Sequence, residues 1–219
     1  MRKATIEETE VTIPVGKAVV YGNLTVPNRA KGIVLFAHGS GSSRFSTRNT
    51  QVAREINAAG IATLLIDLLT REEETVDEFT GEFRFNIDLL ARRLVHATEW
   101  VGKNPDTKSL AVGYFGASTG AAAALIAAAK LPERVKAIVS RGGRPDLAEQ
   151  HLPNVKAPTL LIVGGDDTQV IELNEQASRQ MRAERKIVVV PGATHLFEEP
   201  GKLEEVARLA ISWFSKYIG

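Results

Sequence analysis

The sequence predicts a doubly wound α/β fold, with a mostly parallel sheet of eight strands and helices on both faces. Three observations support this prediction. Short runs of aliphatic and β-branched residues alternate with longer segments in which apolar residues recur at helical spacing. Some short runs, such as residues 32–38, are continuously apolar, which is typical of strands covered on both faces. No linker, repeat or low-complexity tract interrupts this alternation, so we expect one domain over residues 1–219 and no separate lid domain.

The predicted elements follow in order along the chain. Residues 4–13 and 17–26 form a hairpin, with its turn at residues 14–16. The remaining strands are predicted at residues 32–38, 61–67, 109–115, 134–140, 159–163 and 186–190. The helices are predicted at residues 46–59, 84–102, 118–130, 145–151, 170–183 and 200–217. In the last helix, Pro200 suits the first turn because a proline there loses no helical hydrogen bond.

One connection is longer than the others. Residues 68–82 contain the charge run REEETVDE and carry no predicted element. Connections of this length in small domains tend to be functional or mobile. We expect a solvated excursion, and the alternative is a lid across a pocket.

Composition and charge exclude several classes of function. The chain has 27 Lys and Arg against 26 Asp and Glu, so its net charge of +1 gives no electrostatic case for nucleic acid or an anionic membrane as a partner. It has no cysteine, which excludes disulfides, thiolate metal sites and a cysteine nucleophile. The amino terminus lacks the apolar stretch of a signal peptide. We therefore expect a cytoplasmic protein, a monomer or homodimer, that acts on a small molecule.

Residues 116–120 read Gly-Ala-Ser-Thr-Gly, which matches the pattern G-x-S-x-G between a predicted strand and a predicted helix. A turn sharp enough to expose a serine strains its backbone, and the small Gly116 and Gly120 let the chain pass without collision. The following helix directs its free N–H groups at a centre where negative charge develops. Ser118 is therefore the candidate nucleophile, and the alternative is an ordinary glycine-rich turn.

A serine nucleophile needs a base, and the base needs a carboxylate that orients it. Two histidines follow Ser118, and His195 lies in a glycine- and proline-bent loop directly after a predicted strand. His151 ends a short predicted helix, which favours a surface position. Asp167 follows the preceding strand and fits the pattern G-x-x-D-x-x-V, with Asp166 as the alternative. We expect His195 as the base and Asp167 as its partner.

The loop after residues 32–38 reads His-Gly-Ser-Gly-Ser-Ser. Its glycines allow backbone N–H groups to turn inward and form a concavity that binds an anion. We expect the N–H of Ser40, with that of Thr119, to form an oxyanion hole, and Gly41 is the next candidate. We expect His38 to hydrogen-bond its own loop rather than to take part in the chemistry.

Several arginines fall near the predicted carboxyl edge of the sheet. They are Arg44, Arg48, Arg84, Arg141 and Arg144. Because a guanidinium can bind a carboxylate or phosphate with two hydrogen bonds, an acidic substrate is a hypothesis. The candidate substrate-binding residues are Gly41, Arg44, Arg84 and Arg141. The alternative is that the arginines pair with Asp67, Asp146 or loop carbonyls and hold the loops in place.

Taken together, the motifs HGSGSS, GASTG, GGDDTQV and ATHLFEEPG resemble the small, dienelactone hydrolase-like branch of the α/β-hydrolase fold, over about residues 10–217. The resemblance implies that fold, with Ser118 in the nucleophile elbow and Asp167 and His195 completing a catalytic triad. It also implies Ser40 and Thr119 at the oxyanion positions. The namesake of the branch uses a cysteine nucleophile, which this chain lacks, so a general serine esterase fits better.

The expected function is a serine hydrolase that cleaves small carboxylic esters through an acyl-enzyme on Ser118. This chemistry needs no metal and no organic cofactor. A thioesterase, acyltransferase or peptidase could use the same three residues. A non-catalytic binding protein of the same fold is the alternative from another class.

Overall fold

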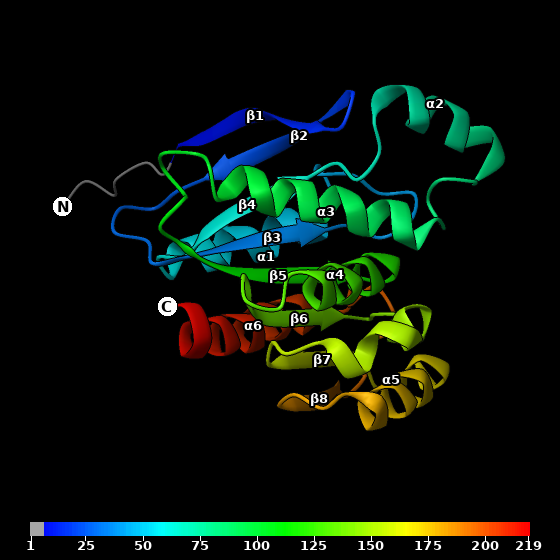
Figure 1. The fold of residues 1–219 in the computed structure, drawn as a ribbon. Coiled ribbons are helices and arrows are strands. Elements are labelled where there is room, and N and C mark those ends of the chain that lie inside the picture. The colour runs from blue at the N-terminus through cyan, green and yellow to red at the C-terminus, as the bar shows by residue number, and fades with distance from the viewer. Residues whose placement is uncertain (1–6) are drawn as a thin grey trace.

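An eight-stranded sheet runs through the computed structural model, which describes residues 7–219 (Figure 1). The strands are β1 (Glu8–Val15), β2 (Ala18–Thr25), β3 (Gly32–Ala37), β4 (Ala62–Ile66), β5 (Ala111–Ala117), β6 (Val135–Arg141), β7 (Thr159–Gly164) and β8 (Arg185–Val190). Their order across the sheet is β1-β2-β4-β3-β5-β6-β7-β8. The β1–β2 and β2–β4 pairs are antiparallel and every other pair is parallel, which confirms the predicted fold class.

Helices cover both faces of this sheet (Figure 1). The helices of the described residues are α1 (Thr47–Ala58), α2 (Arg71–Thr80), α3 (Ile87–Val101), α4 (Thr119–Lys130), α5 (Thr168–Gln180) and α6 (Lys202–Ile218), with a 3-10 helix η1 (Pro145–Asn154), and α2 lies beyond the sheet rather than on a face of it. Buried residues of α1 and α6 form one core with the sheet, and those of α3, α4, η1 and α5 form the other. Over residues 7–219, no helix combines the length and the apolar character that crossing a membrane requires.

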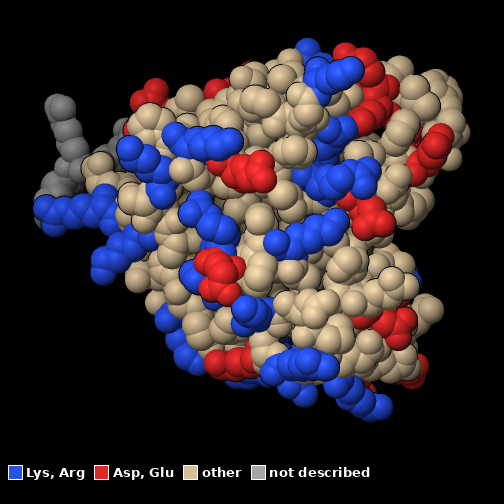
Figure 2. Space-filling model, in the orientation of Figure 1, with Lys and Arg blue, Asp and Glu red and all other residues tan. Residues whose placement is uncertain are grey.

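The sheet topology determines where a site can form. All residues of β3, β4 and β7 are buried, as the continuous apolar runs predicted. Because β3 to β8 are parallel, the loops that follow them meet at one edge, the carboxyl edge, where ligands bind in open α/β sheets. On the face shown in Figure 2, positive and negative side chains are interspersed, and acidic ones gather over α2.

The hairpin turn lies later than predicted. Residues 4–6 of the predicted first strand lie outside the described residues. Pro14 is still within β1, where it pairs with Val19, and the turn is formed by Gly16 and Lys17. Gly16 has a φ of +81°, a conformation that glycine adopts without strain. Proline is tolerated at position 14 because β1 is an edge strand, where a missing N–H breaks no ladder on the open side.

The last helix also begins later than predicted. Its cap is Gly201, in the left-handed conformation, and the helix starts at Lys202. Pro200 therefore precedes the helix rather than occupying its first turn, and that prediction was wrong.

The connection expected to be a solvated excursion contains a helix, α2, which corrects that prediction. The Thr70 hydroxyl accepts the N–H of Glu73, and the Glu73 carboxylate accepts the N–H of Thr70, so both groups of a capping box are present. Three glutamates in the first turn are favoured there by the positive end of the helix dipole. Gly81 ends the helix in the left-handed conformation.

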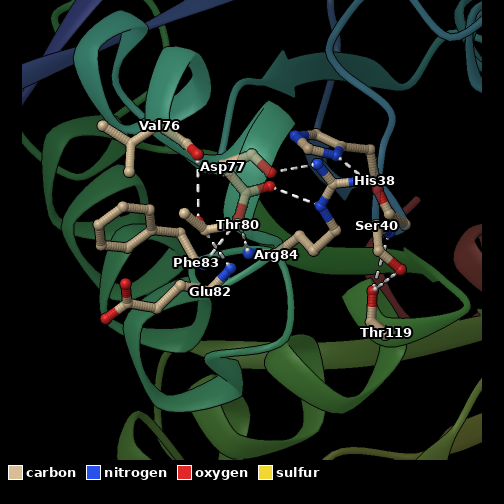
Figure 3. Close-up of polar contacts among 10 residues, drawn as sticks. His38, Ser40, Val76, Asp77, Thr80, Glu82, Phe83, Arg84 and Thr119 are labelled. Carbon is tan, nitrogen blue, oxygen red and sulfur yellow. Dashed lines mark hydrogen bonds and ion pairs between the residues drawn. The ribbon is translucent and has the colours of Figure 1, made fainter.

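Asp77 fastens α2 to the segment that precedes α3 (Figure 3). Its Oδ1 accepts the N–H groups of Phe83 at 2.7 Å and Arg84 at 2.9 Å, and its Oδ2 accepts Nε of Arg84 at 2.6 Å. Burial opposes ionisation of this carboxyl, but the hydrogen bonds from Arg84 and Phe83 outweigh it and lower the pKa of Asp77 below its ordinary value. The ionised form is therefore the one that holds the segment.

The Asp77→Ala variant is expected to loosen the residues on either side of Gly81. The loss of these hydrogen bonds should lower the local opening free energy by about 2 kcal/mol, measured as faster hydrogen exchange of the Phe83 and Arg84 amides. Because the pKa of Asp77 is lowered, the protection in the wild type should persist at pH values above about 4 and be lost as the pH falls further. Glu78→Ala, an exposed change on the same helix, is the control. Equal exchange in the two variants would contradict the role of Asp77.

Candidate active site

Ser118 lies at the turn between β5 and α4. Its backbone has φ +50° and ψ −120°, an unusual conformation for a residue with a side chain. The turn is this tight because Gly120 packs directly against the carbonyl groups of Ala37 and His38, where a Cβ atom would collide with backbone. The G-x-S-x-G segment thus adopts the strained strand-to-helix turn that the sequence predicted.

The structure brings Ser118, His195 and Asp167 together from three loops of the carboxyl edge. Nε2 of His195 lies 3.3 Å from Oγ of Ser118, and its Nδ1 lies 2.6 Å from Oδ2 of Asp167. An ionised carboxylate only accepts, so Nδ1 carries the proton toward Asp167 and Nε2 is free to accept the serine proton. The alternative acid, Asp166, is exposed, and its side chain has no part in this chain of hydrogen bonds.

Two neighbours from the end of β6 fix the position of the His195 loop. A Cβ atom on Gly142 would lie 2.9 Å from the carbonyl oxygen of His195 and 3.5 Å from its ring, so only glycine leaves room for this loop. Arg141 donates from Nη1 to the carbonyl oxygen of Leu196 at 3.2 Å. The imidazole is therefore held from its backbone as well as by Asp167.

The loop after β3 packs against the serine turn. A Cβ atom on Gly39 would lie 3.2 Å from Cβ of Ser118. The N–H of Ser40, the predicted oxyanion donor, donates to the Oγ1 of Thr119 at 3.0 Å (Figure 3). The two residues predicted to form the oxyanion hole are therefore in contact, but the N–H of Ser40 already donates to the hydroxyl of Thr119.

His38 takes the loop-bonding role favoured by the sequence. Its Nδ1 lies 2.9 Å from the carbonyl oxygen of Gly39, and its Nε2 accepts the N–H of Leu68 at 3.1 Å. Burial lowers the pKa of His38, so the neutral ring is favoured, as an Nε2 acceptor requires. This histidine ties the loop after β3 to the chain that follows β4.

Two of the predicted substrate-binding arginines are engaged in ion pairs. Arg44 is buried and bonds Asp67 from both its backbone N–H and its side chain, at 2.9 and 3.0 Å. It also pairs with Glu10. Arg84 pairs with Asp77 at 2.6 Å. The pair of Arg44 with Asp67 is the loop-holding alternative stated above, so the structure gives no support to substrate binding by Arg44. Arg84 also holds a loop, but through Asp77, a partner that the alternative did not name.

The arginines near the end of β6 differ from one another. Arg144 forms two hydrogen bonds to Asp146, at 2.9 and 2.7 Å, as the alternative foresaw. Arg48 pairs with Glu198 at 2.5 Å. Arg141 is buried and makes no ion pair among the described residues. Burial, with Arg48 nearby, lowers the pKa of Arg141 to about 10.

Two cavities flank the loop formed by residues 39–46. The smaller, of about 270 Å³, is lined by Ser118, His195 and Arg141, and so contains the reacting groups. The larger, of about 560 Å³, lies on the α2 side and is lined by Gly41 and Arg84. Both include Ser40 in their walls. Arg44 lines neither of them.

The model of the dienelactone hydrolase family matches residues 17–217. This chain belongs to the dienelactone hydrolase family. The family assignment and the eight-stranded sheet together confirm the resemblance and the α/β-hydrolase fold expected from the sequence.

Several relatives of this family member are known. A dienelactone hydrolase from Anabaena variabilis, known from a crystal structure, is 59% identical, with a TM-score of 0.97 over 99% of this chain and all of that one. Est1E from Butyrivibrio proteoclasticus is 16% identical, with a TM-score of 0.79 over 94% of this chain and 98% of that one, and so shares the fold. A Mycobacterium tuberculosis protein, provisionally named a phosphoribosyl transferase, is 56% identical over 97% of this chain. The match spans 47% of that protein, so this chain is about half the length of its curated relative.

Sequence reasoning missed three residues that line these cavities. Asn49, in the first turn of α1, is buried and lines the smaller cavity. Glu74 and Asp77 of α2 line the larger one. The capping-box pattern at Thr70 could have revealed α2, whereas an asparagine near a helix start is indistinguishable from a capping residue by sequence.

Proposed function

We propose that this family member is a serine hydrolase that cleaves small carboxylic esters through an acyl-enzyme on Ser118. The observation that carries the proposal is the continuous hydrogen-bonded order from Asp167 through His195 to Ser118, with distances of 2.6 and 3.3 Å. Membership of a hydrolase family supports the same chemistry. The strained backbone of Ser118 supports its role as nucleophile, because strain of this kind is concentrated at functional sites.

In the proposed cycle, Ser118 attacks the ester carbonyl while Nε2 of His195 takes its proton. Asp167 holds the ring with Nδ1 protonated and stabilises the imidazolium that forms. The proton then passes from His195 to the departing alcohol, leaving the acyl group on Ser118. Water, activated by the same imidazole, attacks the acyl-enzyme, and the acid and Ser118 are released.

The oxyanion formed in each step would accept from the N–H groups of Thr119 and Ser40. The Ser40 N–H must then exchange the hydroxyl oxygen of Thr119 for the substrate oxygen. That exchange is favourable once the oxygen carries charge, since hydrogen bonds to an ionised acceptor are about twice as strong as neutral ones.

Other functions would use the same groups differently. A thioesterase, acyltransferase or peptidase is distinguished by its products when thioester, ester and amide substrates compete, with water and an alcohol as acceptors. The transferase name belongs to a relative of which this chain matches 47%. The Anabaena variabilis dienelactone hydrolase, which matches 99% of this chain and all of its own, supports hydrolysis instead.

Labelling with a fluorophosphonate tests the proposal. The probe should form one adduct at neutral pH, and peptide mass spectrometry should place it on Ser118. The rate of hydrolysis of a phenylmethyl ester should fall in proportion to the fraction of the protein that is labelled. The absence of an adduct on native protein would favour a non-catalytic binding protein and overturn the proposal.

A further inference from the structure

We propose that Asn49 positions the water molecule that hydrolyses the acyl-enzyme, so that Ser118 passes its acyl group to water in preference to an alcohol. The inference rests on the proposed ester hydrolysis and adds a positioning residue to the second half of that reaction. Asn49 lies in the first turn of α1. It lines the cavity of about 270 Å³ that also contains Ser118 and His195.

Asn49 is a buried polar side chain without a structural partner. It is 2% exposed, its Oδ1 is buried without a donor, and the bond that it makes to Ser46 comes from its backbone N–H. A buried amide without a hydrogen bond costs free energy, so an unpaired one calls for a bound molecule or a function. Neither end of the amide is bonded within residues 7–219. The amide can therefore turn its oxygen toward a molecule in the cavity without breaking a hydrogen bond.

Another buried asparagine on the same helix shows what a structural role looks like. Asn57 donates from Nδ2 to the carbonyl oxygen of Ile61 at 2.9 Å and to Oγ1 of Thr63 at 3.0 Å. Its Oδ1 accepts the hydroxyl of Thr63 at 3.2 Å. Asn57 thus fastens the end of α1 to the start of β4, whereas the side chain of Asn49 fastens nothing among the described residues.

A water that attacks the acyl-enzyme has two hydrogens to place. One goes to Nε2 of His195, which acts as the base, and the other needs a second acceptor. The carbonyl of Leu196 on this wall already accepts from Arg141, and the buried Nε atoms of Arg48 and Arg141 can only donate. Among the buried, unpartnered side-chain atoms of this wall that the structure describes, Oδ1 of Asn49 is the one acceptor.

The water molecule is divided between two partners in this step. Its oxygen bonds to the acyl carbon while one of its O–H bonds breaks, and that proton passes to Nε2 of His195. The second hydrogen stays on the oxygen and is held by Oδ1 of Asn49. The bond from the acyl carbon to Oγ of Ser118 then breaks, Oγ takes the proton from His195, and the carboxylic acid leaves.

An alcohol makes a different demand on the same site. It has a single hydroxyl hydrogen, which goes to Nε2 of His195, and so it has no second hydrogen to place. The acceptor on Asn49 therefore assists water and adds nothing for an alcohol. Replacing Asn49 by leucine, which is similar in size and cannot accept, should shift the acyl-enzyme from hydrolysis toward transfer.

The hydrolysis of p-nitrophenyl acetate separates the two half-reactions. In Asn49→Leu, stopped flow should record a burst of one nitrophenol per Ser118 at the wild-type rate, followed by deacylation slowed on the order of 100-fold. Because kcat/KM reports acylation, kcat and KM should fall together and leave kcat/KM within about threefold of the wild type. Mass spectrometry of the quenched protein should find the acetyl group on Ser118. In aqueous methanol, the ratio of methyl acetate to acetate should rise at least about tenfold.

Three further variants test whether the acceptor itself matters. Asn49→Asp keeps an acceptor at this position and should hold the product ratio within about threefold of the wild type. Ser42→Ala removes a hydroxyl from the same wall and should also keep the ratio. Asn49→Leu should unfold at a temperature no lower than the wild type, because it removes an unpaired buried polar group. Asn57→Leu should unfold at a lower temperature and keep the wild-type ratio.

Three results would overturn the inference. They are deacylation of Asn49→Leu at the wild-type rate, equal slowing of acylation and deacylation in that variant, and the same change of product ratio in Asn49→Asp as in Asn49→Leu. Failure of the proposed function is distinct, because Ser118 would then form no fluorophosphonate adduct and the wild type would release no nitrophenol from the ester.

Discussion

Replacing Ser118 by alanine is expected to lower kcat/KM for small esters by about 10⁴-fold or more. The Oγ of Ser118 is the atom 3.3 Å from the base, and without it no acyl-enzyme can form. Hydrolysis would then depend on direct attack by water with whatever stabilisation the oxyanion donors still provide. Steady-state kinetics on an activated ester and fluorophosphonate labelling measure the loss.

A second serine close by serves as the control. Ser140 is fully buried on the neighbouring strand β6, and its hydroxyl has no hydrogen-bond partner within residues 7–219. Ser140→Ala should therefore keep wild-type labelling and kcat/KM within about threefold. If Ser118→Ala retained more than a few per cent of wild-type activity, another residue would have to be the nucleophile. Labelling that disappears in Ser118→Ala but survives at full rate in His195→Ala would contradict the role of His195 as base.

Asp167→Asn is expected to lower kcat by on the order of 10³- to 10⁴-fold, with little change in KM. The amide that replaces the carboxylate can donate to Nδ1 of His195, which would put the ring proton on Nε2. In that tautomer, Nε2 can no longer accept the proton of Ser118. The carboxylate lies 2.6 Å from Nδ1, so the geometry itself should survive the substitution.

Asp166→Asn is the matched control for that change. The two aspartates are adjacent in sequence, but Asp166 is exposed. Its backbone N–H donates to the carbonyl of Ala193, and its side chain makes no hydrogen bond in the part of the chain that the structure describes. Its substitution should leave kcat within about twofold. Equal losses in the two variants would show that the carboxylates act through the general field of the site rather than through a hydrogen bond to His195.

Much of the site could be predicted because parallel strands place their carboxyl ends at one edge. Each of the three candidate residues, Ser118, Asp167 and His195, follows a strand. Their order along the chain and their places in these loops were therefore enough to predict that they lie close together. The choice of Asp167 over Asp166 also followed from spacing. The buried parallel strands could be predicted as well. A continuous apolar run such as Gly32–Ala37 is typical of a strand covered on both faces, and this pattern is local to the sequence.

The parts that could not be predicted depend on contacts between distant residues. Arg44 meets Asp67 and Glu10, and no local pattern distinguishes this arginine from Arg141, which makes no ion pair among the described residues. The same holds for the hydroxyl of Thr119, which accepts a hydrogen bond from the N–H of Ser40, 79 residues away in the sequence. Such pairings are set by which loops become neighbours, not by the residues beside them.

The helix α2 has a consequence for how substrate range can diverge in this fold. Within α2, Asp77 is the only buried residue. The helix is held by the capping box at Thr70 and by the hydrogen bonds between Asp77 and Arg84. The helix α2 borders the larger cavity, whereas Ser118, Asp167 and His195 all lie on loops that follow strands of the sheet. We therefore expect substitutions at exposed positions of residues 70–86 to change the wall of this cavity and to leave the hydrogen bonds among Ser118, His195 and Asp167 intact. The shape of the larger cavity can accordingly diverge among relatives, or be redesigned, separately from the groups on the sheet loops.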